Sequence, residues 1–140
     1  MGTIYIPKWF SLDELFSQEI CKKYGSVAWS FLDDRLLITL DALRNKYGAI
    51  FVNNWAVGGS LDSAGFRAPN DPVGASFSQH RFGRAADCHF KHYTAEDIRQ
   101  KILLDPEMFP HINAIEMNVS WFHFDVRNCK RIMKFYPTGG

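Results

Sequence analysis

The chain has 140 residues, of which 46% are hydrophobic, and this is enough for one domain with a buried core. Its 16 lysine and arginine residues nearly balance its 15 aspartate and glutamate residues. Because such a chain has no overall field that would attract nucleic acid or an anionic membrane surface, we expect neither as a partner.

Two amphipathic helices are predicted in the N-terminal third. Ser11 followed by Glu14 is the pattern of a capping box, and it predicts a helix that continues to about Gly25. A second helix is predicted to begin at Asp33 or Asp34 and to end at Gly48. The predicted buried residues are Leu12, Leu15, Phe16 and Ile20 in the first helix and Leu36, Leu37, Leu40 and Leu43 in the second.

The remaining chain is predicted to contain four strands, one long loop and one helix. Thr94 followed by Asp97 repeats the capping pattern and predicts a third helix. The segment 58–83 is dense in Gly, Ser, Asp, Asn and Pro, and a loop of this length in a compact domain is more often functional than not. Apolar and β-branched residues predict strands at 49–55, 84–90, 111–117 and 121–126.

This order of elements predicts an α+β fold in which a small antiparallel sheet packs with about three helices. We expect a single domain over 1–140, with a helical part at about 11–48 and a strand-rich part at about 49–136. The start "MGTIYIPKWF" lacks the basic region and apolar run of a secretory signal, so we expect synthesis in the cytoplasm without a signal peptide. No segment approaches the length of a membrane span.

Cysteines and basic residues suggest no other kind of site. Cys21, Cys88 and Cys129 are too few and too scattered for a disulfide framework, so reduced thiols are expected, with Cys88 buried in a strand. The basic run Arg127–Lys134 is interpreted as a solvated strand edge. The alternative, a nucleic-acid-binding surface, would show as heparin retention that weakens steeply with salt.

Two histidines and one aspartate form a candidate metal site. In "SFSQHRFGRAADCHF", His80 precedes Asp87 by seven residues. In "WFHFDV", alternation places His123 on one face of a strand and the phenylalanines on the other, predicted core face. Two imidazoles and one carboxylate leave an open fourth position, as in catalytic zinc sites. Spacing alone does not choose among the five histidines, and His89, His92 and His111 are the alternatives.

Three motifs resemble those of the M15-type zinc peptidases, the group of D-Ala-D-Ala carboxypeptidases and peptidoglycan endopeptidases that shares its fold with the hedgehog signalling domain. "SQHRFGRAAD" matches the SxHxxGxAxD signature, "WFHFDVR" resembles the second element, and "AGFRAP" is similar to an upstream SGYR-type element. The motifs occur in the family's order and cover roughly Trp55–Arg127. Chain length and the "FSLDEL" helix are most similar to compact members from phages and prophages.

The resemblance implies roles for individual residues. His80, Asp87 and His123 would be the zinc ligands. Gly83 and Ala85 would be the small residues that let the turn and the strand pass close to the metal. The resemblance further implies substrate contacts, in which Arg67 would hold a carboxylate or the charge that develops on the attacked carbonyl, and Ser78 would be a minor polar contact or a turn-stabilising hydroxyl.

The general base departs from the family pattern. Many members carry a glutamate or aspartate three residues before the last histidine, where this chain has Ser120, and serine cannot accept the proton. Glu116 is the first candidate, and it would face the metal if the turn at Asn118 and Val119 has two residues but not if it has three. Asp125 is the second candidate, although it is also placed to orient His123.

The resemblance implies a monomeric zinc metallopeptidase that hydrolyses peptidoglycan stem or cross-bridge peptides by metal-activated water, with 49–136 as the catalytic part. Such an enzyme would act at the bacterial cell wall as a phage or prophage lysin. The alternative is a catalytically silent, zinc-containing structural or binding module of a phage particle, which Ser120 keeps open. The sequence does not choose between carboxypeptidase and endopeptidase, or between lysis, cell entry and wall turnover.

Overall fold

The computed structural model describes residues 3–137, so the ends of the predicted domain, 1–2 and 138–140, lie outside the described residues. Within this range the chain has an α+β fold, as predicted. The helices are α1 (Leu12–Leu15), α2 (Gln18–Tyr24), α3 (Asp34–Tyr47) and α4 (Ala95–Leu104), with 3-10 helices η1 (Gly25–Phe31), η2 (Trp55–Val57), η3 (Gln79–Phe82) and η4 (Pro106–Met108). The strands are β1 (Ile50–Phe51), β2 (Ala85–Phe90), β3 (Ala114–Glu116), β4 (Phe122–Asp125) and β5 (Met133–Phe135).

The five strands form one mixed sheet in the order β1-β2-β4-β3-β5. Three neighbouring pairs are antiparallel, but β5 runs parallel to β3. The prediction of an antiparallel sheet is therefore wrong at this edge. The segment after β4 passes the beginning of β3, and β5 then runs along the outer side of β3 in the same direction. The basic run Arg127–Lys134 ends in this exposed edge strand, as interpreted.

The first predicted helix is divided into two. Ser17 begins a new helix, since its Oγ accepts a hydrogen bond from the Ile20 backbone N–H. Phe16 between the two helices is extended, with φ −130° and ψ 153°, and this conformation turns its side chain into the core. The chain consequently has four α-helices within 3–137 rather than about three. The predicted caps at Ser11 with Glu14 and at Thr94 with Asp97 are confirmed.

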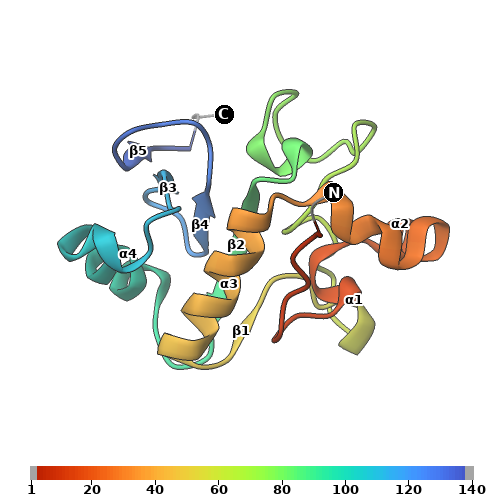
Figure 1. Ribbon diagram of the computed structural model, residues 1–140, viewed down its shortest axis with the longest axis horizontal. Coiled ribbons are helices and arrows are strands. Elements are labelled where there is room, and N and C mark those ends of the chain that lie inside the picture. The colour runs from red at the N-terminus through yellow and green to blue at the C-terminus, as the bar shows by residue number, and fades with distance from the viewer. Residues whose placement is uncertain (1–2, 138–140) are drawn as a thin grey trace.

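The hydrophobic core lies between the helices and the sheet. Figure 1 shows α3 crossing the sheet in front of β2, and α4 contacts β2 and β4 beside it. The predicted leucines of α3 are buried, as are Leu15 and Phe16, whereas Leu12 and Ile20 are only partly buried against the core. On β4, Phe122 and Phe124 are fully buried in the core, which confirms the predicted face. Among residues 3–137, no helix is long and apolar enough to cross a membrane.

The first predicted strand is shorter than expected. Only Ile50 and Phe51 of the segment 49–55 pair in the sheet. The Asn53 backbone N–H instead donates to the Glu14 carbonyl oxygen, and the Asn53 Oδ1 accepts from the Ala64 N–H. These contacts draw the chain away from the sheet and place the start of the long loop beside β2.

Candidate metal centre

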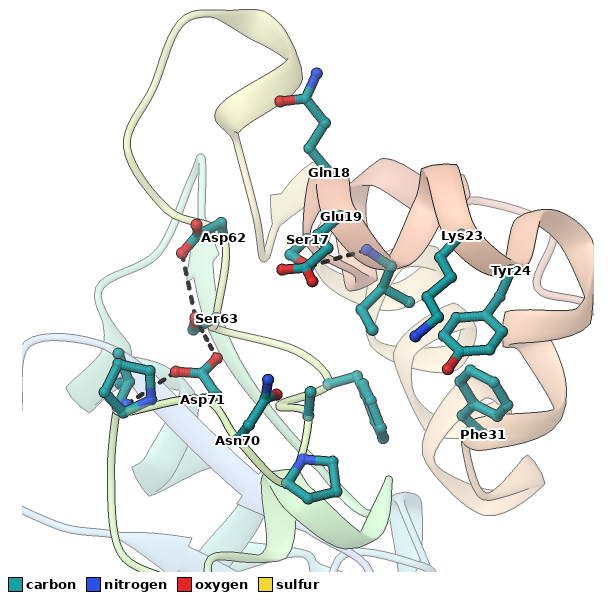
Figure 2. A pocket seen from close by; sticks show the side chains of 16 residues that line it. Ser17, Gln18, Glu19, Lys23, Tyr24, Phe31, Asp62, Ser63, Asn70 and Asp71 are labelled. Atoms are coloured by element: carbon teal, nitrogen blue, oxygen red, sulfur yellow. Dashed lines mark hydrogen bonds between the residues drawn. The ribbon is translucent and has the colours of Figure 1, made fainter.

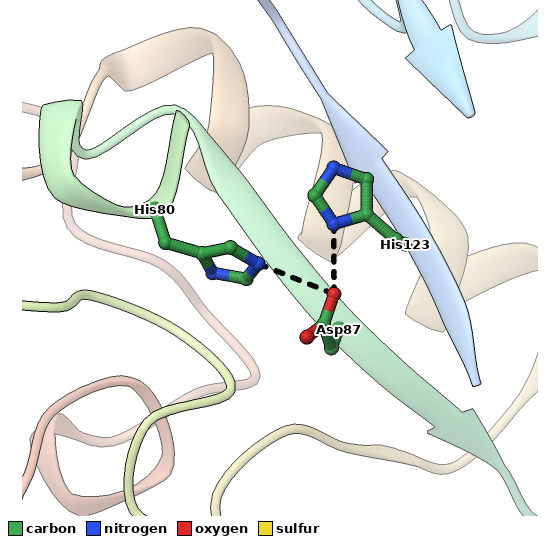
Figure 3. A group of neighbouring side chains, drawn as sticks. All are labelled: His80, Asp87 and His123. Carbon is green, nitrogen blue, oxygen red and sulfur yellow. Dashed lines mark hydrogen bonds and ion pairs between the residues drawn. The ribbon is translucent and has the colours of Figure 1, made fainter. Parts of the chain in front are cut away.

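His80, Asp87 and His123 converge on one point from three separate elements. His80 lies on η3, Asp87 on β2 and His123 on β4, and each offers a ligand atom within 4.8 Å of the other two. Figure 3 shows both imidazoles directed at the Asp87 carboxylate. Asp87 Oδ1 is 3.2 Å from His80 Nε2 and 2.8 Å from His123 Nδ1. Asp87 and His123 are direct partners in the β2–β4 register, so their side chains leave the same face of the sheet.

The second nitrogen of the His80 ring is held by the long loop. His80 Nδ1 lies 2.7 Å from the Gly65 carbonyl oxygen, so Nδ1 carries the proton and Nε2 is left free to bind a cation. Gly65 is pressed against α1, because a Cβ at this position would collide with the Leu15 carbonyl group. The Asp87 N–H donates to the Ala64 carbonyl oxygen at 2.8 Å and attaches the same loop to β2.

The His123 ring is held by a chain of charges along β4. His123 Nε2 lies 2.9 Å from Asp125 Oδ2, and the Arg127 guanidinium donates to both Asp125 oxygens at 2.7 Å. His123 and Asp125 alternate along β4 and lie on one face, and Arg127 follows two residues after the strand ends. A histidine whose outer nitrogen is bonded to a carboxylate presents its other nitrogen in a fixed direction, which is the arrangement found around metal-binding histidines.

The charges of the site depend on this arrangement. Burial lowers the pKa of His80, which keeps this imidazole neutral and able to bind a metal. Burial also acts against charge on Asp87, but hydrogen bonds from His123 and His80 outweigh it and hold the pKa of this carboxyl well below its usual range. Burial would lower the pKa of His123, but hydrogen bonds to Asp125 and Asp87 raise it to about 9. A metal ion at Nδ1 must therefore displace a proton from His123.

We expect the stability of the metal-free protein to fall as the pH rises from about 7 to about 9. The pKa of His123 is about 9 in the folded chain and about 6.5 when unfolded, so its stabilising contribution is complete below pH 6.5 and is lost through pH 9. His80 acts in the opposite sense but only below its unfolded pKa, outside this window. Melting temperatures in the presence of a chelator measure the effect, and His123→Gln should abolish the decline.

Arg67 and Ser78 lie next to the three metal-binding candidates. Arg67 Nη2 is 3.4 Å from Asp87 Oδ2, and its Nε donates to the Ser63 carbonyl oxygen at 2.8 Å. Ser78 Oγ accepts from the His80 backbone N–H at 3.3 Å and lies 3.5 Å from Arg67 Nη1. Ser78 thus caps η3 and stabilises the turn that carries His80, which is the second of the two roles considered for it.

Gly83 has a different task from the one expected. Its φ of +69° lies in the left-handed region, and a Cβ would collide with the Phe31 carbonyl oxygen. The Gly83 carbonyl oxygen accepts from the Asp33 N–H at 2.9 Å. Gly83 therefore lets η3 pack against the chain before α3, rather than letting a turn approach the metal. Ala85 is fully buried in β2, opposite Asp125.

Glu116 lies on the same face of the sheet as His123. The register pairs Ala114 with Asp125 and Ile115 with Phe124, so its next step sets Glu116 opposite His123. In this register six residues, 117–122, lie between Glu116 and His123, more than the two or three considered. Six is an even number like two, so Glu116 has the orientation expected for a two-residue turn. The Glu116 carboxylate accepts a hydrogen bond from Trp121 Nε1–H at 3.2 Å. Burial lowers the pKa of Arg67, and the nearby carboxylates of Asp87, Asp71 and Glu116 oppose this only in part.

Asp125 is fully buried, and both of its oxygens are occupied by His123 and Arg127. Burial would raise the pKa of Asp125, but these hydrogen bonds lower it below its usual value. A carboxylate in this state has no free path to a substrate, so the geometry favours the orienting role for Asp125.

An open cleft of about 410 Å³ reaches the candidate metal centre at Asp87. Its lining also includes Arg67, Trp121 and His89. His89 stacks on Phe51 at 4.8 Å, and within residues 3–137 neither it nor His92 or His111 belongs to a group of three potential ligands. The sequence motifs did not reveal Gly65 as the partner of His80. Arg127 was treated only as part of a basic run, although its spacing of two residues from Asp125 was a usable signal.

Comparison with known proteins adds no relative. No protein-family model matches the chain, and searches among curated proteins and solved structures also find no match.

Proposed function

We propose that this chain is a zinc-dependent peptidase that hydrolyses peptidoglycan stem or cross-bridge peptides, as in the D,D-carboxypeptidases and endopeptidases that its motifs resemble. One observation carries the proposal: three ligand atoms from η3, β2 and β4 lie within 4.8 Å, and the outer nitrogen of each histidine already has a partner. Two nitrogen ligands and one carboxylate oxygen suit zinc, and three protein ligands leave a position for water or substrate.

When bound, zinc would act as a Lewis acid that polarises the substrate carbonyl and lowers the pKa of a water molecule. The residues of the chain perform the other tasks. Asp125 and Gly65 hold the two imidazoles in the ligand orientation, and the Arg67 guanidinium, which is only 12% exposed, faces the cleft beside Asp87. Glu116, next to His123 in the sheet, would take the proton from water and deliver it to the leaving nitrogen.

We expect Arg67→Lys to reduce turnover by roughly 10²-fold, as for the loss of one transition-state donor. Lysine keeps the charge but cannot donate simultaneously toward Ser63, Ser78 and the cleft as the planar guanidinium does. Steady-state kinetics on a soluble stem peptide measure the effect. Arg84→Lys is the matched control, because Arg84 lies over the Phe82 ring and does not line the cleft. Unchanged kinetics of Arg67→Lys would make Arg67 an ordinary loop residue.

The test of the proposed function is digestion of purified sacculi. Zinc-loaded protein should release peptides whose new termini identify the bond that is cut, and a chelator should stop the release. Peptides freed only of a terminal D-alanine would indicate a carboxypeptidase, whereas opened cross-links would indicate an endopeptidase. Release of peptides from intact cells to which the protein is added would support action as a phage or prophage lysin at the cell wall.

The second candidate is a catalytically silent, zinc-containing structural or binding module, for example in a phage particle. Two observations favour it: Ser120 occupies the position of the expected base and is exposed, and Trp121 already binds the Glu116 carboxylate. If zinc-loaded protein binds sacculi but releases no peptide from any of them, the result would establish the silent zinc-containing module and exclude the peptidase.

A further inference from the structure

A second groove lies between α2 with η1 and the long loop, and no step of the proposed reaction uses it. Figure 2 shows Glu19, Lys23 and Tyr24 on the helical side, facing Asp62 and Asn70 and their neighbours on the loop side. The groove has a volume of about 630 Å³, which lies within the range of about 300–1,000 Å³ found for small-molecule sites.

The loop side of this groove is held rigidly by one arginine. Arg81 on η3 donates five hydrogen bonds to backbone carbonyl oxygens, at distances between 2.6 and 3.1 Å. The acceptors are the carbonyls of Ala68, Pro69, Asp71, Val73 and Ala75. A loop fixed through its own backbone presents a preformed wall, and a ligand then loses little free energy in ordering it.

The floor of the groove is aromatic and its rim is polar. Phe31 and Phe66 lie 5.7 Å apart between ring centroids, and Tyr24 packs on Phe31 at 5.0 Å while remaining 38% exposed. Around these rings the rim carries carboxylates, two amides and hydroxyls, with one ammonium group on Lys23. Such a rim has acceptors and donors for a ligand rich in hydroxyl and amide groups, and its excess of carboxylates disfavours an anion.

The groove and the cleft at the candidate metal centre lie next to each other. Asp62, Ser63 and Val73 line both spaces. A ligand in the groove can therefore extend into the cleft beside Asp87 and Arg67. A polymer that carries sugar and peptide portions next to each other matches the two spaces in chemistry and in position.

We infer that this groove binds the saccharide portion of the wall polymer, an N-acetylated amino-sugar chain, while the attached peptide enters the metal cleft. The inference rests on the proposed function for the identity of the polymer. The ring faces of Tyr24 and Phe66 stack against pyranose rings, and Asp62, Asp71 and Asn70 bond their hydroxyl and acetamido groups. Retention on the wall would then come from the peptidase domain itself.

The test is titration of the zinc-loaded protein with the tetramer of N-acetylglucosamine, followed by NMR or calorimetry. The parent protein should bind, with shifts centred on Tyr24 and Asn70. Tyr24→Ala should bind about tenfold more weakly, the effect of truncating one central aromatic contact. Asn70→Ala, an exposed loop change that leaves the fold intact, should also weaken binding. Trp9→Ala is the matched control, because Trp9 is an exposed aromatic with a lysine over its ring but lies outside the groove.

The titration measures binding and the digestion of sacculi measures turnover, so the groove inference and the proposed function can fail separately. A protein that digests sacculi but does not bind the tetramer overturns the groove inference and leaves the peptidase standing. A protein that binds the tetramer through Tyr24 but releases no peptide supports the groove inference and excludes the peptidase. Binding of the lysine-containing peptide Ala-Ala-Lys through Tyr24, with no binding of the tetramer, would make the groove a peptide subsite and overturn the inference.

Discussion

Replacing any one of His80, Asp87 and His123 with alanine should empty the metal site and abolish hydrolysis. The parent protein should carry close to one zinc per chain after gel filtration, as expected for three protein ligands with one open position. Each ligand comes from a different element, so metal bound to the folded state alone should also raise the melting temperature of the parent and not of the variants. Elemental analysis and thermal unfolding with and without zinc measure both effects.

His92→Ala is the control for this series, because His92 is an exposed histidine outside the group of three ligands. It should retain zinc and activity. Circular dichroism must show that each ligand variant is folded, since Asp87→Ala also removes the partner of both imidazoles. Full zinc occupancy in His123→Ala would exclude His123 from the ligands.

Glu116→Gln should retain zinc and the fold but lose roughly 10²- to 10⁴-fold in peptide release, the usual contribution of a general base. Glutamine has nearly the same size and can still accept a hydrogen bond from Trp121 Nε1–H, but it cannot take a proton from water. The strand register sets Glu116 beside His123, and its carboxylate contacts Trp121, which lines the cleft. Initial rates on sacculi, together with zinc content, separate a lost base from a lost metal.

Asp125→Asn is the contrasting variant. Its effect should appear in the metal affinity, as a loss of roughly 10- to 100-fold, because Asp125 orients His123 rather than facing the substrate. Competition with a zinc-binding dye measures this affinity. An inactive but fully metallated Asp125→Asn, together with an active Glu116→Gln, would transfer the base to Asp125. If both variants were as active as the parent, neither carboxylate would be the base.

Several features of the fold could be read from the sequence because they depend on neighbouring residues. The caps at Ser11 and Thr94, the helix end at Gly48 and the leucine face of α3 each follow from spacings of a few residues. The division at Ser17 and the early end of β1 were missed. The cap at Ser17 is local, but the Trp55 Nε1–H bond to the Phe16 carbonyl oxygen, which holds the residue before it, comes from across the chain. The early end of β1 likewise depends on the distant Asn53 N–H bond to the Glu14 carbonyl oxygen.

The sequence by itself determined which side chains are candidates for the metal, since alternation along β4 sets the direction of His123 and the spacing of His80 and Asp87 forms a recognisable motif. Only the tertiary structure decided how these residues are held and which carboxylate lies opposite His123 in the sheet. The Gly65 bond to His80 joins separate segments, and the position of Glu116 opposite His123 depends on strand register. Such contacts are set by packing and by the length of the connection at 117–121, which local spacing does not encode.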